Sequence, residues 1–463
     1  MTAQIESPQL THWSQANVTE EDLAHIPGEA GWPLVGNTLK LLRDPVAYSL
    51  RMFHEFGPVF RARTFGDWGV ILLGAEANEM VLRNKNQVFS NEQGWGPLLD
   101  QLFPGGLMLM DFEPHRIDRR ALGVAFAKGP LENYSHALGA GMEREVKTWS
   151  GEITFYPKIK HLALVLAAES FVGVPWGDEA EQINDAFVGI VQATVSPVRK
   201  PLPFTQLKQG LESRAFLVDY FTAECERRRS SGTFGSDIFS QFASATREDG
   251  ELLSTTEVVD QTIFLMMAAH DTITSSATSV VYQLAKHPDW QQTLREEIWS
   301  VTGEPDASGT PRPLAFSDLG KLSLTEMLFK ESLRMRPPLP AMPRRALRDF
   351  EFGGYHIPAG TSLGLDIHYT HYSKKYWDDP YAFDPYRFSP ENEPTHTDFA
   401  WVPFGGGAHK CLGLRFADMQ IKLLLTQLLG RYHISIEEGY EPKWQVYPIQ
   451  KPRDGLAIEL RPI

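Results

Sequence analysis

Apolar positions recur with a helical period over most of the chain, and proline and glycine interrupt them. The pattern predicts helices near 45–56, 75–85, 289–301 and 322–335, and several more between 130 and 232. Alternating residues predict two hairpins, at 59–73 with a turn at 65–67 and at 350–357 with a turn at Gly353-Gly354. The predicted fold class is therefore mainly α with small β-sheets.

One helical pattern is much longer than the others. Ser254 and Glu257 form a capping-box sequence, and nothing breaks the pattern until His287-Pro288. A helix of that length spans roughly 50 Å. Its middle, 266–276, combines small residues with hydroxyls, which either bond back to the carbonyl four residues earlier or leave room for a flat group and water.

The segment 90–110 has no helical period but is rich in apolar residues, so it is predicted to be a loop. An apolar loop either covers a pocket or folds back into the core. Further on, helices are predicted near 178–196 and 204–229, with a proline-rich connector between them.

Composition and charge narrow the class of protein. The 463 residues carry a net charge of −14, which argues against nucleic-acid binding, and no linker divides them. Two cysteines indicate a reducing compartment, and we find no apolar run long enough for a membrane anchor. We expect an N-terminal extension at 1–25, one domain at 26–463, and a cytoplasmic location.

Cys411 lies in the stretch FGGGAHKCLG, residues 404–413, just before a predicted helix that ends near 429. A thiolate is a soft ligand that suits iron. Glycines let backbone N–H groups approach the sulfur, and the N-terminal end of the helix adds positive potential. The alternatives are a small buried hydrophobe, a simple turn, or a nucleotide loop, which lacks the expected glycine spacing.

The stretch resembles the haem-binding loop of the cytochrome P450 family, FxxGx(R/H)xCxG, at Phe404, Gly407, His409, Cys411 and Gly413. The resemblance implies a triangular helical prism whose long central helix crosses a b-type haem. Cys411 would be the proximal iron ligand, Phe404 would pack on the thiolate side, and Gly413 would contact the cofactor. The 26–463 domain would be the haem domain.

The central helix resembles the family pattern (A/G)-(G/A)-x-(D/E)-T at 268–272. The resemblance implies that Ala268 lies against the haem, while Asp271 and Thr272 deliver protons on the dioxygen side. Ala269 and Ile273 depart from the commonest pattern, but the acid–alcohol pair is intact.

The family also binds its haem propionates with cations. His115 and Arg119 match its His-x-x-x-Arg pattern, and their spacing places both on one helix face. Arg344 matches the later propionate arginine, with Arg345 as the alternative. His409 stands where most members have arginine, so its role there is the least certain.

A further match is the ExxR motif, Glu331 and Arg334, followed downstream by Arg387. The resemblance implies a buried structural network of these three residues beneath the haem loop. His368 and His371 lack a nearby third ligand, so a metal site there is not expected.

The resemblance implies a monooxygenase that takes dioxygen and two electrons, supplied from NAD(P)H by a ferredoxin reductase and a ferredoxin. A basic patch of Lys410, Arg415, Arg116 and Arg120 is predicted to dock that ferredoxin. A monomer acting on a small apolar substrate, steroid, terpenoid or fatty-acid-like, is expected. The predicted pocket residues are Phe264, Met267, Leu339, Ala341 and Met342.

Two other functions stay open. A peroxide-dependent peroxygenase would usually lack the pair that Asp271 and Thr272 form. A non-catalytic haem-thiolate ligand sensor would need no proton relay and would usually carry a partner domain.

Overall fold

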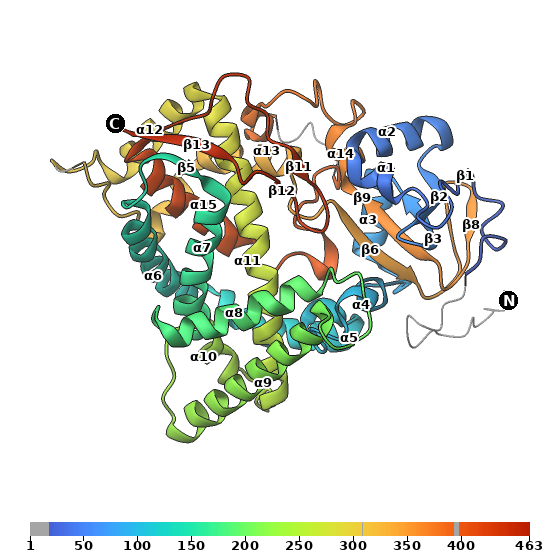
Figure 1. Ribbon diagram of the computed structural model, residues 1–463, viewed down its shortest axis with the longest axis horizontal. Coiled ribbons are helices and arrows are strands. Elements are labelled where there is room, and N and C mark those ends of the chain that lie inside the picture. The colour runs from blue at the N-terminus through green and yellow to red at the C-terminus, as the bar shows by residue number, and fades with distance from the viewer. Residues whose placement is uncertain (1–17, 308, 393–397) are drawn as a thin grey trace.

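The computed structural model describes residues 18–307, 309–392 and 398–463. Figure 1 shows a triangular outline with most helices on one side and the largest sheet on the other. The long helix α11 (Thr255–Lys286) runs through the middle of the helical part. The predicted class, mainly α with small sheets, is confirmed.

The helices occupy most of the described chain, and α11 is the longest of them. The others are α1 (Thr38–Arg43), α2 (Pro45–Phe56), α3 (Ala75–Arg83), α4 (Glu92–Leu99), α5 (Phe112–Gly123), α6 (Lys128–Val146), α7 (Phe155–Ala167), α8 (Asp178–Ala193), α9 (Gln206–Ser231), α10 (Ile238–Ala243), α12 (Pro288–Thr302), α13 (Ser323–Met335), α14 (Ile367–Tyr372) and α15 (Leu414–Leu429).

The strands form one larger and three smaller sheets. The larger sheet has the order β1-β2-β3-β9-β6-β4, and the smaller ones are β10-β13-β5, β11-β12 and β7-β8. Their bounds are β1 (Gly28–Glu29), β2 (Val59–Thr64), β3 (Asp67–Leu72), β4 (Phe89–Ser90), β5 (Gly151–Thr154), β6 (Ala341–Ala346), β7 (Phe350–Phe352), β8 (Tyr355–Ile357), β9 (Ser362–Asp366), β10 (Tyr432–Ser435), β11 (Trp444–Gln445), β12 (Lys451–Pro452) and β13 (Ala457–Pro462).

Local sequence explains the elements that were predicted well. The Asp44 side chain accepts a hydrogen bond from the Ala47 N–H, and Pro45 begins α2 at a position that needs no N–H donor. The capping box of Ser254 and Glu257 is present at the start of α11. Both predicted hairpins are confirmed, as the antiparallel pairs β2/β3 and β7/β8.

The prediction of a loop at 90–110 was wrong for its first half, because Glu92–Leu99 forms α4 despite an internal proline. Packing overrides weak helix propensity here. A Cβ atom added to Gly94 would lie 2.6 Å from the Pro343 carbonyl oxygen, so α4 rests directly on β6. The rest of the segment buries Leu102, Phe103 and Leu107 in the main core, as the folded-back alternative expects.

The predicted N-terminal extension, 1–25, lies partly outside the described residues, which begin at 18. Its last part is packed, since Leu23 is fully buried beside Ile26 against the larger sheet. Among the helices of the described ranges, none combines the length and the apolar character needed to cross a bilayer.

Candidate active site

The loop that carries Cys411 is held against α3 immediately before α15 begins. Gly407 has a φ of +60°, and a Cβ atom there would lie 1.9 Å from the Leu82 carbonyl oxygen. Only glycine fits such a position without moving the backbone. The Cys411 N–H donates to the Phe404 carbonyl at 2.9 Å, so the loop closes on itself around the cysteine.

The surroundings of Cys411 do not fully stabilise its thiolate. The residue is exposed by its accessible surface, yet enough protein surrounds the sulfur that burial raises the pKa of its thiol. The Gly413 N–H and the charges of Arg119 and Lys410 oppose that rise without cancelling it. A metal ion would supply the positive charge that a stable thiolate lacks, so this cysteine fits an iron ligand.

Four predicted propionate partners converge beside this loop. The His115 ring, on α5, lies 3.8 Å from the His409 ring between centroids. Burial, followed by the charges of His115, Arg344 and Arg119, lowers the pKa of His409 to about 2. Burial and Arg119 lower the pKa of His115 to about 4. Both rings are therefore neutral donors at physiological pH.

Arg344 is the strongest indication of an anionic ligand. It is 6% exposed, and burial lowers the pKa of its guanidinium to about 10 against the opposing charge of Asp111. Within the described ranges no carboxylate lies within ion-pair distance of it, and its guanidinium donates a hydrogen bond to the Pro343 carbonyl. A buried guanidinium in this setting suits a carboxylate, as a haem propionate would provide.

Asp111 was missed as a site residue. Its carboxylate accepts from the Ser90 hydroxyl and from the Asn91 N–H at 2.8 Å, and it lies 3.8 Å from the His409 Nε2. Burial raises the pKa of this carboxyl, although those hydrogen bonds and Arg344 oppose the rise. Asp111 is far from His409 in the sequence, so no local pattern linked the two residues.

Arg119 and Arg345 take different positions. Arg119 donates to the Lys410 carbonyl. Burial raises the pKa of Cys411 and lowers that of Arg119, whereas the charge of each residue opposes the shift of the other, so Arg119 faces the loop that carries Cys411. Arg345 donates to the Gly360 carbonyl at 2.7 Å and lies on the opposite face of β6 from Arg344. Arg344 is thus the better placed of the two alternatives.

The middle of α11 contains the predicted acid–alcohol pair. The Thr272 hydroxyl donates to the Ala268 carbonyl at 2.7 Å, so the bond back along the helix is the one observed. Residues 267–269 and 271–273 are half-buried, whereas the part of α11 that follows, 274–285, is buried. This partly exposed stretch fits the close approach of a flat group.

Asp271 points toward α7. Its Oδ1 lies 3.1 Å from the His270 Nδ1 and 3.7 Å from the Lys160 ammonium. Burial raises the pKa of Asp271, but His270 and the charges of Lys160 and Lys451 outweigh it and hold the pKa below the usual range. Lys160 was missed, because no local pattern links α7 to α11.

The predicted pocket residues lie on two elements. Phe264 is buried on α11, where its ring packs against Gly106, and Met267 follows it. Leu339 and Ala341 are half-buried at the start of β6, and the Met342 sulfur lies near Gly405 of the cysteine loop.

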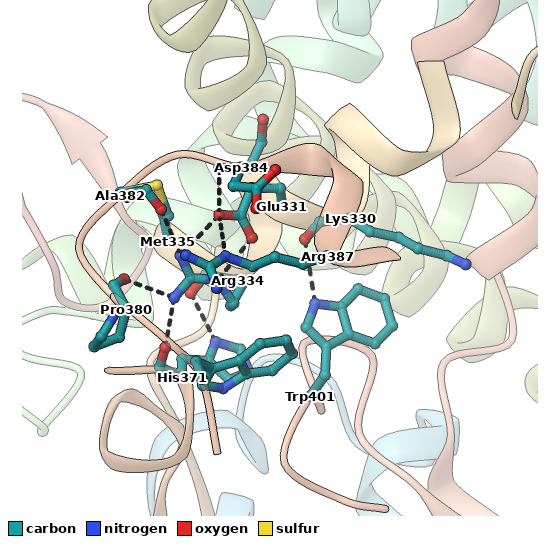
Figure 2. A network of polar contacts seen from close by, with 12 residues as sticks. Lys330, Glu331, Arg334, Met335, His371, Pro380, Ala382, Asp384, Arg387 and Trp401 are labelled. Carbon is teal, nitrogen blue, oxygen red and sulfur yellow. Dashed lines mark hydrogen bonds and ion pairs between the residues drawn. The ribbon is translucent and has the colours of Figure 1, made fainter. Parts of the chain in front are cut away.

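The three predicted network residues lie together, as Figure 2 shows. Arg334 donates to both carboxylate oxygens of Glu331, at 2.6 and 2.8 Å, and both side chains are fully buried. The Arg387 Nε lies 3.5 Å from the same carboxylate. Carbonyls of His371 and Pro380 accept from the remaining Arg334 nitrogen, so the buried charge is fully hydrogen-bonded.

Two of the four residues in the predicted basic patch have acidic partners. Arg116 pairs with Glu113 and Glu248, and Arg120 pairs with Glu248. Glu248 comes from the segment before α11, a neighbour that the sequence did not reveal. Of the four, Lys410 and Arg415 have no ion pair with any residue that the structure describes.

The fold and this site are those expected of a protein that would hold a cofactor through a cysteine and buried cations. A cytochrome P450 family model matches residues 26–453, and the chain belongs to that family. It is accordingly a haem-thiolate monooxygenase in general class.

Relatives and a solved structure agree with this assignment. Cytochrome P450 136 of Mycobacterium tuberculosis is 36% identical over 453 residues, which cover 95% of this chain and 89% of the relative. Taxane 13-alpha-hydroxylase of Taxus cuspidata is 29% identical, with 94% and 91% covered. The retinoic-acid-bound structure of cyanobacterial CYP120A1 superposes with a TM-score of 0.84 at 28% identity and covers 95% of this chain and 99% of that one.

Proposed function

We propose that the protein hydroxylates an apolar, isoprenoid-like small molecule. Apolar side chains of α11 and β6, with Phe264 and Met342 both buried, support an apolar substrate. Relatives named for taxane and beta-amyrin oxidation, and a neighbour with bound retinoic acid, favour the terpenoid side of the steroid, terpenoid and fatty-acid range. One oxygen atom enters a C–H bond and the other leaves as water, with two electrons and two protons consumed.

The site residues have separate roles in binding the haem. Cys411 holds the haem iron, while His115, Arg119, Arg344 and His409 hold the propionates. The thiolate-ligated haem supplies dioxygen activation when bound. The buried donors fix the cofactor's orientation, and the exposed loop face of Cys411 lies on the side from which electrons arrive.

Asp271 and Thr272 deliver protons toward the cofactor side. The lowered pKa of Asp271 keeps its carboxylate ionised, so this carboxylate can accept hydrogen bonds from proton donors on the Lys160 side and orient them toward the cofactor side. The Thr272 hydroxyl would leave its bond to the Ala268 carbonyl in order to donate on the cofactor side. This intact pair favours an oxygenase over a peroxygenase or a ligand sensor.

The observation that carries the proposal is the Cys411 loop, whose His409 lies within the influence of the buried cation Arg344. Cys411→Ser should abolish the red-shifted Soret band of the reduced carbon-monoxide complex, and a persisting band would refute the ligand assignment. Turnover with ferredoxin, reductase and NAD(P)H, compared with peroxide alone, separates monooxygenase, peroxygenase and sensor. Spin-state titrations with a retinoid, a taxane, a sterol and a fatty acid rank the substrate classes.

The proposal also covers the redox partner, the oligomeric state and the cellular location. A ferredoxin would dock near Lys410 and Arg415, the unpaired cations beside the cysteine loop. We further propose a monomer in the cytoplasm, consistent with two reduced cysteines. Charge reversal of Lys410 should slow reduction by ferredoxin in a salt-dependent manner, and unchanged kinetics would contradict this docking site.

A further inference from the structure

His371 lies between the buried ion pair and the cysteine loop. It is fully buried on α14, and Figure 2 shows it beside the guanidinium of Arg334. Its Nδ1 lies 2.8 Å from the Arg334 carbonyl oxygen, and its Nε2 lies 3.3 Å from the Val402 N–H. One ring thus joins the end of α13 to the segment that leads into the loop.

Its partners fix the tautomer of this ring. A carbonyl oxygen only accepts and a backbone N–H only donates, so Nδ1 carries the proton and Nε2 accepts. Arg334 stands in the last turn of α13, where carbonyls have no partner within the helix. His371 therefore caps the helix end with one nitrogen and holds the loop with the other.

From Val402 the hydrogen bonds continue to the cysteine. The Val402 carbonyl accepts from the Gly405 N–H at 2.9 Å, and the Phe404 carbonyl accepts from the Cys411 N–H at the same distance. The path runs from the Glu331–Arg334 pair through a single ring to the backbone around the sulfur.

We infer that His371 is a positioning residue that uses its neutral Nε2 to fix the Val402 backbone, and through it the Cys411 loop, for thiolate ligation. The inference rests on the proposed role of Cys411. It concerns the side chain alone, because the His371 carbonyl that accepts from Arg334 survives substitution.

Two variants separate the hydrogen bond made by Nδ1 of the ring from the one made by Nε2. In His371→Gln the side-chain oxygen reaches the Nε2 position and accepts from Val402. In His371→Asn the amide reaches only the Nδ1 position, so the Arg334 bond is kept and the Val402 bond is lost. His368→Asn is the matched control, since His368 is equally buried on α14 and has no hydrogen bond to the loop.

The measurements are the carbon-monoxide spectrum of the reduced holoenzyme and hydrogen exchange of the peptide that contains Val402. We expect His371→Asn to shift most of the Soret band from the thiolate to the thiol position and to speed exchange about tenfold. His371→Gln and His368→Asn should keep the thiolate band, and hydrogen exchange at Val402 should stay as slow as in the unchanged protein. Equal behaviour of the Asn and Gln variants would overturn the inference.

Failure of the inference is distinguishable from failure of the proposed function. If Cys411→Ser keeps the red-shifted band, the ligand assignment itself is wrong. If Cys411→Ser abolishes the band while His371→Asn keeps it and leaves exchange unchanged, only the role of His371 is wrong. Should His371→Asn yield no folded protein while His371→Gln folds and keeps the band, the dependence on the Val402 bond is upheld.

Discussion

The rings of His115 and His409 lie 3.8 Å apart, centroid to centroid, with an angle of 30° between their planes. One comes from α5 and the other from the cysteine loop, so the contact joins two separate parts of the proposed propionate site. Because burial keeps both rings neutral, this site would offer an anion neutral donors beside the charges of Arg119 and Arg344.

This arrangement predicts that His409→Arg tightens haem binding. A permanent charge replaces a neutral donor, and a hydrogen bond to a charged group contributes roughly 1.5–3 kcal/mol. We expect haem loss to a haem-scavenging protein to slow by about tenfold. His161→Arg, at an exposed position on α7, is the control and should leave the rate unchanged. Faster loss from His409→Arg would show that the site cannot accept another cation.

Asp271→Asn should lower product formation by roughly 100-fold, since positioned acid–base groups contribute that much or more. Haem content and the carbon-monoxide spectrum should not change, because Asp271 is not a haem-holding residue in the proposal. Since its pKa is below the usual range, the carboxylate should support activity unaltered from pH 8 down to about pH 5. The exposed Asp219→Asn on α9 is the control, and equal losses would remove Asp271 from the proton path.

Glu331→Gln should destabilise the fold by about 3–5 kcal/mol, because it leaves Arg334 buried without its counter-charge. Glu326→Gln is matched to it on the same helix. Glu326 is 44% exposed in its ion pairs, so its loss should cost under about 1 kcal/mol. Urea unfolding followed by circular dichroism compares the two, and similar midpoints would contradict the burial argument.

Arg199 lies in the connector between α8 and α9, and its hydrogen bonds link that connector to α4. Its guanidinium donates to the carbonyls of Ala193 and Thr194 and, across the gap in sequence, to those of Pro97 and Leu98. Arg199→Ala should therefore free the connector and raise both the association and dissociation rates of a haem-ligating azole several-fold, with little change in affinity. Stopped-flow spectroscopy measures both, with exposed Lys200→Ala as control, and unchanged rates would mean that the connector does not gate the pocket.

The sequence by itself determined those features whose causes are local. The caps and breaks of α11, from Ser254 to His287, act within a few residues, as do the glycines that turn the two hairpins. The glycine spacing around Cys411 is likewise a local requirement, and it carried the family resemblance. Such features could be predicted because each depends on neighbours in the chain.

Only the tertiary structure decided the features that depend on distant partners. Glu92–Leu99 contains glycines and a proline and is helical because β6 supports it. Glu248 neutralises Arg116 and Arg120, and Lys160 meets Asp271 across two helices. His371 looked like an isolated histidine until folding placed Arg334 and Val402 at its two nitrogens. A hydrogen bond or ion pair between remote segments leaves no local pattern, so the sequence could not predict it.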